Sequence, residues 1–339
     1  MHVLHLVGAT TTRFYYDLSR TYQDRCVAPF GTRASVLTVA PDGAMTWAGQ
    51  GQDPFPCNLA DVAQRARGID VVVPHMFCQA GMTTWRALFE DVMGVPVVGP
   101  NAASIHVATS KWQTKALARS VGVDTPEARR LTTTDVAPPS RLPVIVKPDG
   151  EDNSIGLTLV RDRADWPGAL RKALDAAPVA LVEDYVPGRE VRVGVIEDHG
   201  APRVLPILEY HVTPDRPIRE RSDKVVVDAT GAVTTKSWEQ PSLRTSCPAH
   251  LAALTRDDLH HAAIAMHAAL GARDYSLFDF RIDEAGKPWL LEACIFWTFS
   301  QISVITRMLE AEGSDLARTS MAVWANAASR KRAVQVAAE

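Results

Sequence analysis

The sequence has few cysteines, and they form none of the patterns that bind metals or carry redox chemistry. Five cysteines are scattered over 339 residues, and no two are spaced as CxxC. An odd, dispersed set argues against a zinc site or a disulfide framework. We therefore expect free thiols and a reducing, cytoplasmic setting. The five are Cys26, Cys57, Cys78, Cys247 and Cys294.

Long apolar runs and strong charge are also missing. No stretch approaches the ~18 uninterrupted apolar residues of a membrane-spanning helix, and the opening "MHVLHLVGA" carries no basic leader. We expect neither membrane insertion nor export. The formal net charge is only −3, which gives no support to a nucleic-acid partner and leaves a small molecule as the default ligand.

The first glycine-containing loop lacks the spacing of a dinucleotide site. It reads "GATTTRF", whereas a dinucleotide pyrophosphate needs the spacing G-x-G-x-x-G between a strand and a helix. This absence argues against an oxidoreductase built on the N-terminal region.

What is present is a large apolar fraction in an alternating order. Hydrophobic residues make up 46% of a chain that is long enough for two or three subdomains. Apolar runs at 2–9 and 69–76 are typical of strands buried on both faces, and segments of helical spacing lie between them. We predict an open α/β sheet over roughly residues 1–100, followed by a helix over about 103–121.

The rest of the chain predicts further strands, helices and one long loop. "LPVIVKPDGEDNSIGLTLV" (142–160) indicates two strands around a mobile polar tip. The long charged segment 214–243 is typical of a lid or a disordered loop. Other predicted elements are a helix near 164–176, two strands about a Pro-Gly turn at 179–197, a helix at 256–272, a β-hairpin at 275–294 and a helix at about 314–329.

The predicted hairpin "YSLFDFRIDEAGKPWLLEAC" carries two acids that should face each other. With the turn near 285–286, Asp279 and Glu292 fall opposite one another. Paired carboxylates repel unless a cation lies between them, and Mg²⁺ prefers such oxygen ligands. The alternative is two solvated acids on an exposed hairpin.

Two lysines and two acids suggest a nucleotide site. Lys147 ends the apolar strand "VIVKP" beside the polar tip, and Lys111 follows the first domain. Lysines at such places suit phosphate binding as point charges. In "VEDYVPGRE", Glu183 and Glu190 flank an aromatic residue and a turn, a combination suited to an adenine amino group and a ribose. Each feature taken alone is also compatible with an ordinary solvated side chain.

Taken in order, these segments resemble the ATP-grasp superfamily, and within it the D-alanine–D-alanine ligases. The likeness runs from about residue 70 onward and rests on "GVPVVGPNAASIHVATSKWQTK", "LPVIVKPDGEDNSIG", "VEDYVPGREVRVGV", "SDK" and "DFRIDEAGKPWLLEAC". It implies an α/β (α+β) ATP-grasp fold. The implied parts are an N-terminal open α/β domain (1–102), a central domain (103–190) and a C-terminal domain (191–339) with the magnesium site and a lid loop at 212–246.

The resemblance also implies cofactors, partners and roles. ATP and Mg²⁺ would be used to join a small-molecule carboxylic acid to an amine through an acyl phosphate, and a homodimer is an expectation. Lys111, Lys147 and Lys224 would contact ATP phosphates, with Lys224 reaching the γ-phosphate. Ser154, Ile155 and Gly156 would close over the phosphates. Glu183, Tyr185 and Val186 would line the adenine pocket, and Glu190 would bind the ribose. Asp279 and Glu292 would hold Mg²⁺.

The substrate side departs from the family pattern. Where the family places the first amino acid's ammonium with a glutamate, a serine and a lid tyrosine, this sequence has Arg13, Asn153 and Val225. An ammonium there would lose its counter-charge. We therefore expect a substrate without a free α-amine at that place, or one with an acid that Arg13 pairs. His75 is retained as a substrate-side residue.

Two further departures lie near the metal acids. The family's oxyanion-stabilising arginine is replaced by Leu277, and we expect Arg281, on the same strand face as Asp279, to substitute for it, with Lys224 and Ser154 as the other catalytic residues. The family's metal-binding asparagine is replaced by Cys294, a soft and poor ligand for Mg²⁺. Among the residues that follow, Phe296, Trp297 and Phe299 should form an apolar acceptor wall, and Ser303 falls where the family binds the acceptor carboxylate, or simply caps a helix.

These patterns predict an ATP-dependent carboxylate–amine ligase with altered specificity, acting in the assembly of a specialised, peptide-like natural product. One alternative is a D-alanine–D-alanine or D-alanine–D-lactate ligase of cell-wall synthesis. Another is a catalytically inactive, ATP-binding regulatory protein. Retention of the ATP-side lysines and acids favours an enzyme.

Overall fold

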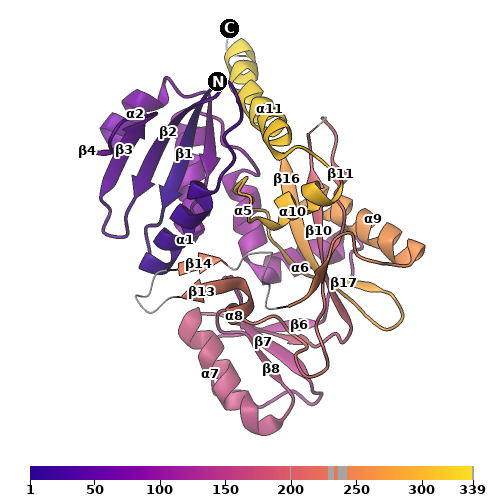
Figure 1. Ribbon diagram of the computed structural model, residues 1–339. Helices are drawn as coiled ribbons and strands as arrows, with labels where there is room; N and C mark the ends of the chain where they lie inside the picture. Colours follow the sequence, from indigo (N-terminus) through magenta and orange to yellow (C-terminus); the bar gives the residue numbers. More distant parts are fainter. Residues whose placement is uncertain (199, 228–232, 236–242, 338–339) are drawn as a thin grey trace.

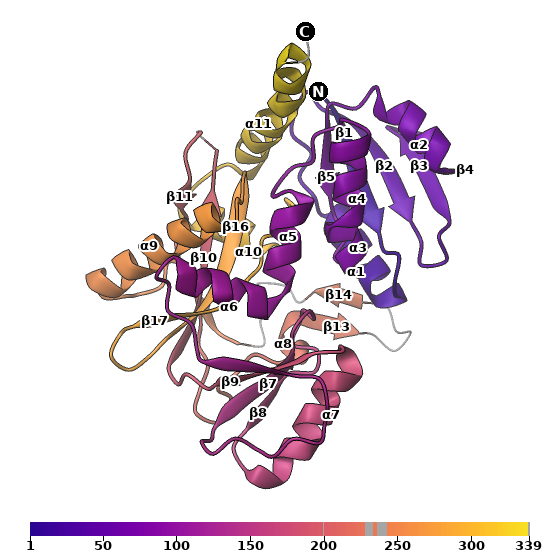
Figure 2. The ribbon, with the colours of Figure 1, turned by 180° about the vertical axis from the view of Figure 1, so that it is seen from behind.

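The computed structural model describes residues 1–198, 200–227, 233–235 and 243–337. It is a mixed α/β structure with three main sheets (Figure 1). The N-terminal sheet, the central sheet and the C-terminal sheet surround the helices α5 and α6, which the view from behind shows between the first and the third (Figure 2). Within the described residues, no helix is long and apolar enough to cross a bilayer.

The N-terminal sheet has the order β4-β3-β2-β1-β5 and is mixed. β1 pairs in parallel with β2 and β5, as predicted for an open α/β sheet, whereas β3 and β4 are antiparallel. No strand was predicted between residues 33 and 57, where β2, β3 and β4 are only partly buried. The elements are β1 (His2–Gly8), α1 (Arg13–Asp24), β2 (Arg33–Val39), β3 (Met45–Gly49), β4 (Phe55–Cys57), α2 (Leu59–Ala66) and β5 (Val71–Pro74).

A run of short helices follows: α3 (Gln79–Met82), α4 (Thr84–Ala87), the π-helix η1 (Leu88–Val92), α5 (Ala102–Thr109) and α6 (Lys111–Ser120). The single helix predicted at 103–121 is wrong, since the chain leaves helical geometry at Ser110. The Ser110 hydroxyl accepts from the Gln113 N–H and donates to Asp149. This N-cap starts a new helix whose first residue is Lys111.

The central sheet has the order β6-β9-β7-β8 and is antiparallel throughout. β7 and β8 form the predicted pair of strands around the tip that includes residues 149–157. α7 covers the sheet through Trp166 and Leu170, which are buried. The elements are β6 (Ala128–Leu131), β7 (Val144–Pro148), β8 (Thr158–Val160), the 3-10 helix η2 (Arg163–Asp165), α7 (Trp166–Ala176) and β9 (Ala180–Asp184).

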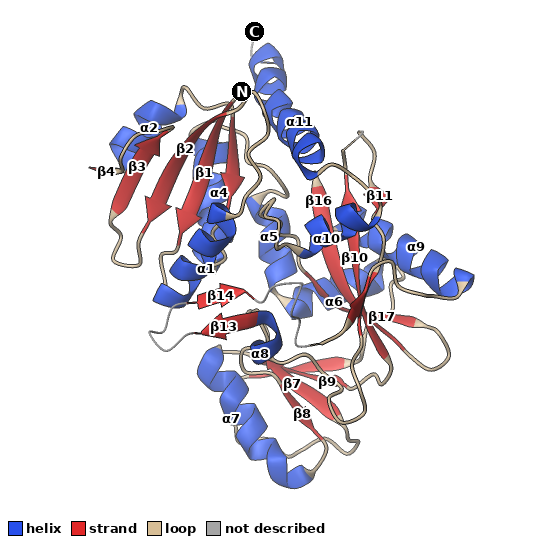
Figure 3. Cartoon of the chain, viewed as in Figure 1, coloured by secondary structure: helices blue, strands red, loops and turns tan. Residues whose placement is uncertain are grey.

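The C-terminal sheet has the order β15-β12-β10-β16-β17, with β11 paired to β10. The predicted hairpin is confirmed as β16 and β17, and Asp279 pairs in register with Glu292. α9 packs on one face of this sheet, and α10 and α11 complete the chain (Figure 3). The elements are β10 (Arg189–Ile196), β11 (Arg203–Val204), β12 (Leu208–Tyr210), β15 (Thr245–Ser246), α9 (Ala253–Ala269), β16 (Tyr275–Ile282), β17 (Pro288–Ala293), α10 (Val304–Ala311) and α11 (Leu316–Ala337).

The predicted lid contains a short helix and a hairpin, α8 (Arg221–Lys224), β13 (Val225–Val227) and β14 (Val233–Thr235). Residues 228–232 and 236–242 of this segment lie outside the described residues. The described hairpin lies between α1 and the central sheet in both ribbon views, and β14 contacts α1 (Figures 1 and 2). We propose the three-part division at 1–102, 103–190 and 191–339 on the basis of these sheets.

Asp274 ties the N-terminal and C-terminal parts together. Its side chain is fully buried and accepts from the Gly99 N–H at 2.7 Å and from the Arg330 guanidinium at 2.9 and 3.0 Å. Gly99 lies just before α5, whereas Arg330 lies on α11. A buried carboxylate with this many donors is a strongly coupled group, because removing its charge leaves a cation without a partner.

We predict that Asp274→Asn lowers the free energy of unfolding by about 3 kcal/mol. Asparagine tolerates the positive φ of 64° at this position, so the loss would report the ion pair rather than backbone strain. Urea unfolding followed by circular dichroism measures it. The control is Arg13→Ala, which removes an ion pair whose arginine is 75% exposed. That variant should change stability by about 0.5 kcal/mol or less, and an equal loss in both variants would contradict the prediction.

Candidate active site

Two adjoining cavities lie where the three sheets meet. The larger cavity, of about 230 Å³, is lined by α1, by the segment around Phe77, by strands β10 and β12 and by residues 292–305. The smaller cavity, of about 80 Å³, is lined by the central sheet, the tip loop and the metal-side acids. Both include Lys111, Asp152, Arg219 and Glu292. These shared residues place the two cavities next to each other, along a shared wall.

Of the predicted phosphate lysines, Lys111 lies at this shared wall and Lys147 lines the smaller cavity. Lys111 is buried, and its Nζ donates to the Glu151 carbonyl at 2.5 Å and lies 3.5 Å from the Glu292 carboxylate. Lys147 is buried at the end of β7 and donates to Glu183 at 2.7 Å. Burial alone would lower the pKa of Lys147, but the carboxylates of Glu183 and Glu292 outweigh it and raise the pKa. Lys147 therefore stays cationic.

Glu183 has two lysine partners. Besides Lys147, Lys115 contacts its second oxygen at 2.8 Å, and all three side chains are buried. Burial would raise the pKa of Glu183, but the two lysines lower it. The carboxylate that was expected to face adenine thus holds Lys147 in place as well. Sequence reasoning missed Lys115, although its spacing of four from Lys111 places both on one side of α6.

The tip loop closes over the smaller cavity. Asn153 and Ser154 adopt φ values of 54° and 57°, and the Ser154 hydroxyl donates to the Arg219 carbonyl at 2.9 Å. Ser154 and Ile155 line the cavity. Gly156 does not line it; its φ is +71°, and an added Cβ would meet the Pro148 ring at 2.7 Å. Its role in this structure is therefore to let the loop turn against β7.

The adenine and ribose residues predicted from the sequence also meet in the smaller cavity. Tyr185, Val186 and Glu190 line it, and Glu190 is buried between two arginines. Arg219, from the base of the lid, pairs with Glu190 and lies 3.9 Å from the centre of the Tyr210 ring. The segment around Arg219 was predicted only as a lid. Arg219 is therefore a cation of this cavity that was not predicted from the sequence.

The predicted catalytic place of Arg281 is not supported by its contacts. Its guanidinium donates to the carbonyl oxygens of Gly188 and Pro217 and lies 3.3 Å from Glu190. It lines the smaller cavity and not the larger one. The β16 strand presents Arg281 and Asp279 on one face as expected, but the arginine side chain extends towards the turn at Gly188.

The two metal-side acids have the predicted register but different surroundings. Asp279 is buried between Arg192, whose Nε lies 2.6 Å from Oδ1, and Arg219, whose Nη2 lies 3.1 Å from Oδ2. Asp279 Oδ1 is buried without an aligned hydrogen bond. Glu292 is 22% exposed and faces Lys111. The arginines and lysines therefore supply part of the charge compensation that was expected from a metal alone.

The carboxylates of Asp279 and Glu292 fit one magnesium ion. Two carboxylates on paired strands offer hard oxygen ligands, one of them without an aligned hydrogen bond, and Mg²⁺ completes its shell with water and phosphate oxygens. Cys294 adds no suitable ligand. Burial raises the pKa of its thiol well above the ordinary value, so the group is a neutral, soft sulfur. The set does not fit a second magnesium that would need an oxygen donor at this position.

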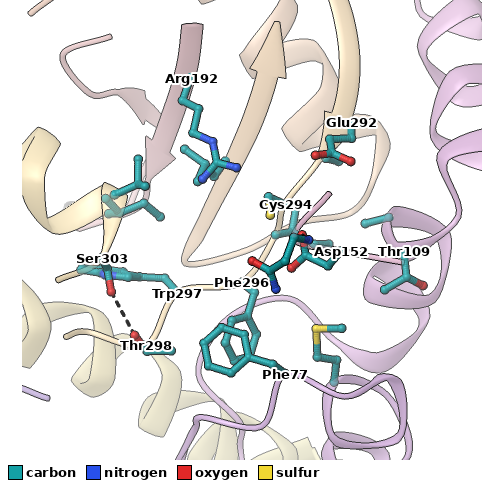
Figure 4. Close-up of a pocket in the computed structure, with 18 of the residues that line it drawn as sticks. Phe77, Thr109, Asp152, Arg192, Glu292, Cys294, Phe296, Trp297, Thr298 and Ser303 are labelled. Atoms are coloured by element: carbon teal, nitrogen blue, oxygen red, sulfur yellow. Dashed lines mark hydrogen bonds between the residues drawn. The ribbon is translucent and has the colours of Figure 1, made fainter. Parts of the chain in front are cut away.

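The predicted acceptor wall forms one side of the larger cavity (Figure 4). Phe296 lines it and packs against Phe77 with ring centroids 4.8 Å apart. Trp297 is 2% exposed but still contributes to the lining. Phe299 is fully buried in the core and is not part of the wall. An amphipathic or aromatic substrate part would find apolar surface here.

Ser303 also lines the larger cavity. It stands at the N-cap position of α10, but its side chain makes no capping hydrogen bond. Instead its hydroxyl lies 2.9 Å from the Thr298 hydroxyl, as the dashed line in Figure 4 marks. The pair of hydroxyls could donate to a substrate oxygen, so the helix cap alone does not account for Ser303.

Two residues predicted for the substrate lie elsewhere. Arg13 is 75% exposed, pairs with Asp17 one helical turn away and lines neither cavity. His75 is fully buried, and its Nε2 lies 2.9 Å from Nδ1 of His5. Burial lowers the pKa of His75 well below the ordinary value. A neutral histidine paired inside the core has no surface to offer a substrate.

The predicted lid lysine is only partly described. Lys224 is the last residue of α8, but its side chain, like that of Val225, lies outside the described residues. The γ-phosphate role of Lys224 therefore stays a prediction.

Sequence reasoning also missed residues of the larger cavity. Arg192 extends into the cavity from β10, and Asp152, Tyr22 and Tyr210 also line it (Figure 4). Arg192 lies four residues after the Pro-Gly turn, in the quoted run "GREVRVGV". An arginine that alternates with the buried apolar residues Val191 and Val193 was a signal that could have identified it.

We predict that the stability contribution of Lys115 depends on pH. Burial lowers its pKa to about 8, whereas the ordinary value is 10.5. Below pH 8 the folded and unfolded chains both hold this proton, so no slope arises. Between about pH 8 and 10.5 the unfolded chain binds more protons, so stability rises with pH.

The measurement compares wild type with Lys115→Met. The difference in free energy of unfolding should move in favour of wild type between pH 8 and 10, by on the order of 3 kcal/mol over the whole window. Lys172→Met, at an exposed position, controls for the loss of a lysine. The same pH trend in both variants would contradict the assignment to Lys115.

Comparisons with known proteins agree with this geometry. The family model described as "D-ala D-ala ligase C-terminus" matches residues 117–319. An uncharacterized protein, y4sG, from Sinorhizobium fredii is 31% identical over 209 residues, which cover 60% of this chain and 57% of that protein. The D-alanine–D-alanine ligase of Bordetella avium is 28% identical over 247 residues, covering 72% of this chain and 73% of that enzyme. The match to the first relative thus spans less than two thirds of its length.

Solved structures show the same fold at low identity. The VanG D-Ala:D-Ser ligase of Enterococcus faecalis has a TM-score of 0.74 and 16% identity, covering 95% of this chain and 98% of that one. A D-alanine–D-alanine ligase from Bacillus anthracis has a TM-score of 0.75 and 16% identity, covering 98% and 99%. Because the family model covers more than half of the sequence, the chain belongs to the D-alanine–D-alanine ligase family of the ATP-grasp superfamily.

Proposed function

We propose that the protein is an ATP-dependent ligase that joins a carboxylic acid to an amine through an acyl phosphate, with release of ADP and phosphate. The observation that carries this proposal is the shared wall of the two cavities. Lys111 and Glu292 lie at this wall, and Lys147 and Asp279 line the smaller cavity next to them, in a chain of this family. The smaller cavity would hold the nucleotide, and the larger one the substrates.

In the first step a carboxylate oxygen of the acid attacks the γ-phosphorus of ATP, and the bond to the ADP oxygen breaks. Lys111 and Lys147 would bind phosphate oxygens and offset their charge, with Lys224 as a third candidate. Ser154 and Ile155 would cover the phosphates, while Tyr185, Val186 and Glu183 would contact adenine and Glu190 the ribose. Most of the rate enhancement would come from position and charge compensation.

In the second step the amine nitrogen attacks the acyl carbon of the acyl phosphate. The carbonyl electron pair moves to oxygen and then returns as phosphate leaves, and the proton lost by nitrogen leaves on the phosphate. The larger cavity would exclude water from this step through its apolar wall. Magnesium, held by Asp279 and Glu292, would supply charge neutralisation at the phosphate oxygens.

We propose that the substrates differ from those of cell-wall ligases. Arg13, which stands where the family has a glutamate, is exposed and lines neither cavity, and the wall of Phe296 and Trp297 is apolar. Assembly of a specialised natural product is the setting we favour. A second candidate is D-alanine–D-alanine ligation, which the names of relatives such as the Bordetella avium enzyme favour. The third, an inactive ATP-binding regulator, is less consistent with the set of buried lysines.

The proposal is tested by measuring ADP release against a panel of carboxylic acids and amines, with D-alanine included. Turnover with an apolar acid or amine, and not with D-alanine, is the expected result. Activity with D-alanine alone would establish the second candidate. Tight ATP binding without turnover on any pair would establish the third.

We predict that Glu292→Gln lowers ADP release at least about a hundredfold while leaving the circular dichroism spectrum unchanged, because an amide compensates neither Mg²⁺ nor Lys111 as a carboxylate does. The remaining activity should need a higher magnesium concentration. Glu284→Gln, an exposed acid in the turn of the same hairpin, is the matched control. Normal turnover in Glu292→Gln would remove the metal assignment.

A further inference from the structure

We propose that Arg192, on β10, is the catalytic arginine of the ligation step, in place of the position on β16 that here carries Leu277. It would contact the oxygen of the acid substrate that becomes negatively charged when the amine attacks. This inference rests on the proposed ligase function. Arg192 lies on β10, the strand next to β16. An alignment of the sequence at the β16 position therefore does not identify it.

The register of the two strands places Arg192 for this task. β10 and β16 are antiparallel, with Arg192 paired to Asp279 and Gly194 paired to Leu277. Residues two apart on one strand share a face, so Arg192, Asp279 and Leu277 all point the same way. Leu277 is the diagonal neighbour of Arg192, and long side chains bridge such pairs. An arginine at 192 can therefore bring its guanidinium over the position where a β16 arginine would be.

The contacts of Arg192 leave donors for a ligand. Its side chain is 12% exposed, its Nε lies 2.6 Å from Asp279 Oδ1, and its Nη2 donates to Asp279 Oδ2 at 2.9 Å. In the described part of the chain, its hydrogen bonds and ion pairs use Nε and Nη2 only. A guanidinium has five N–H donors in a fixed plane. Arg192 can thus be held by Asp279 while Nη1 serves the cavity that it lines.

Arg192 lies in a group of arginines on one face of the C-terminal sheet. Three arginines, Arg192, Arg219 and Arg281, share two carboxylates, Glu190 and Asp279. On this strand face the arginines outnumber the carboxylates by one, whereas the acids Glu151, Asp152 and Asp223 line other parts of the larger cavity. Glu292 and Lys111 form a further pair of opposite sign at 3.5 Å. Since the larger cavity is lined mainly by apolar side chains, an anionic oxygen there would be stabilised more strongly than in water.

The two other arginines of the group are less suited to the role. Arg281 is bonded to two backbone carbonyls and lines the smaller cavity only. Arg219 lines both cavities but pairs with both Glu190 and Asp279, and its backbone carbonyl accepts from Ser154. Figure 4 shows Arg192 extending from its strand towards the cavity that Cys294 and Phe296 also line. Arg192 is therefore the arginine of this group that lines the larger cavity without also lining the smaller one.

The main test measures turnover in Arg192→Leu, Arg192→Lys and the double variant Arg192→Leu/Leu277→Arg. Arg192→Leu should lower kcat about 100- to 1,000-fold, with the KM for ATP little changed. Arg192→Lys should recover only part of the loss, since lysine lacks the planar fork. The double variant should regain at least about tenfold over Arg192→Leu, because a guanidinium returns to the same space from the neighbouring strand.

Three results would overturn the proposal. One is a kcat of folded Arg192→Leu within about threefold of wild type. Another is a double variant no faster than Arg192→Leu, and the third is a loss seen only as a higher KM for ATP or magnesium. The last two would mean that Arg192 acts by holding Asp279. The control is Arg203→Leu, which removes an arginine from the ion pairs with Asp198 and Glu312, away from both cavities.

A binding measurement separates failure of this inference from failure of the ligase function. Thermal shift with ADP and 3-phenylpropanoate, an apolar carboxylate, reports the anion site without turnover. Wild type and the double variant should gain stability from this probe, and Arg192→Leu should not. Binding lost in Arg192→Leu but no turnover on any substrate pair would overturn the ligase function alone. Equal binding in all three proteins, or none in any of them, would overturn the role of Arg192.

Discussion

The ion pairs around Asp279 are the constraint on which the site depends. A buried carboxylate is costly unless cations compensate it, and here Arg192 and Arg219 do so from β10 and from the base of the lid. The same carboxylate faces Glu292 across the hairpin. One side chain thereby couples the C-terminal sheet to the lid segment at the wall of the smaller cavity. Any ligand that approaches Asp279 meets arginines that are already oriented.

This coupling extends to the central sheet through a second set of charges. The Arg219 carbonyl accepts a hydrogen bond from the Ser154 hydroxyl. Lys111, on α6, donates to the Glu151 carbonyl and pairs with the Glu292 carboxylate. Glu183 holds Lys147 and Lys115 in the same way on the nucleotide side. The tip loop, the lid base and the hairpin are thus connected by charged groups and not only by apolar packing. Such groups respond directly to the charge of bound phosphates, which is a physical basis for closing the site on ATP.

The sequence predicted some features of this site and missed others, for reasons that differ from residue to residue. The facing of Asp279 and Glu292 was predicted correctly, but it depends on a shift of register between Asp279 and Phe280 that the sequence analysis did not include. The break at Ser110 was missed although its signal is local, because Ser110 and Gln113 have the Ser-x-x-Gln spacing of a helix start and the Ser110 hydroxyl accepts from the Gln113 N–H. Arg281 was predicted on the correct strand face, but a face does not determine direction, and the carbonyl of Gly188 decides where the guanidinium lies. Arg13 was placed by alignment to a pattern, and its helix turns it to solvent.

The two sides of the site are under different physical demands. A triphosphate presents the same charges whatever acid or amine is joined, so the lysines and acids around it have little freedom to vary in kind. The substrate wall must match only one pair of molecules, and an apolar surface such as that of Phe296 and Phe77 can change shape without leaving a buried charge unpaired. Any such ligase needs a cationic group in contact with the reacting oxygen. The strand that carries this group can differ. An arginine at 192 and a leucine at 277 can therefore perform what an arginine at 277 would do, because both positions open onto the same face of the same sheet.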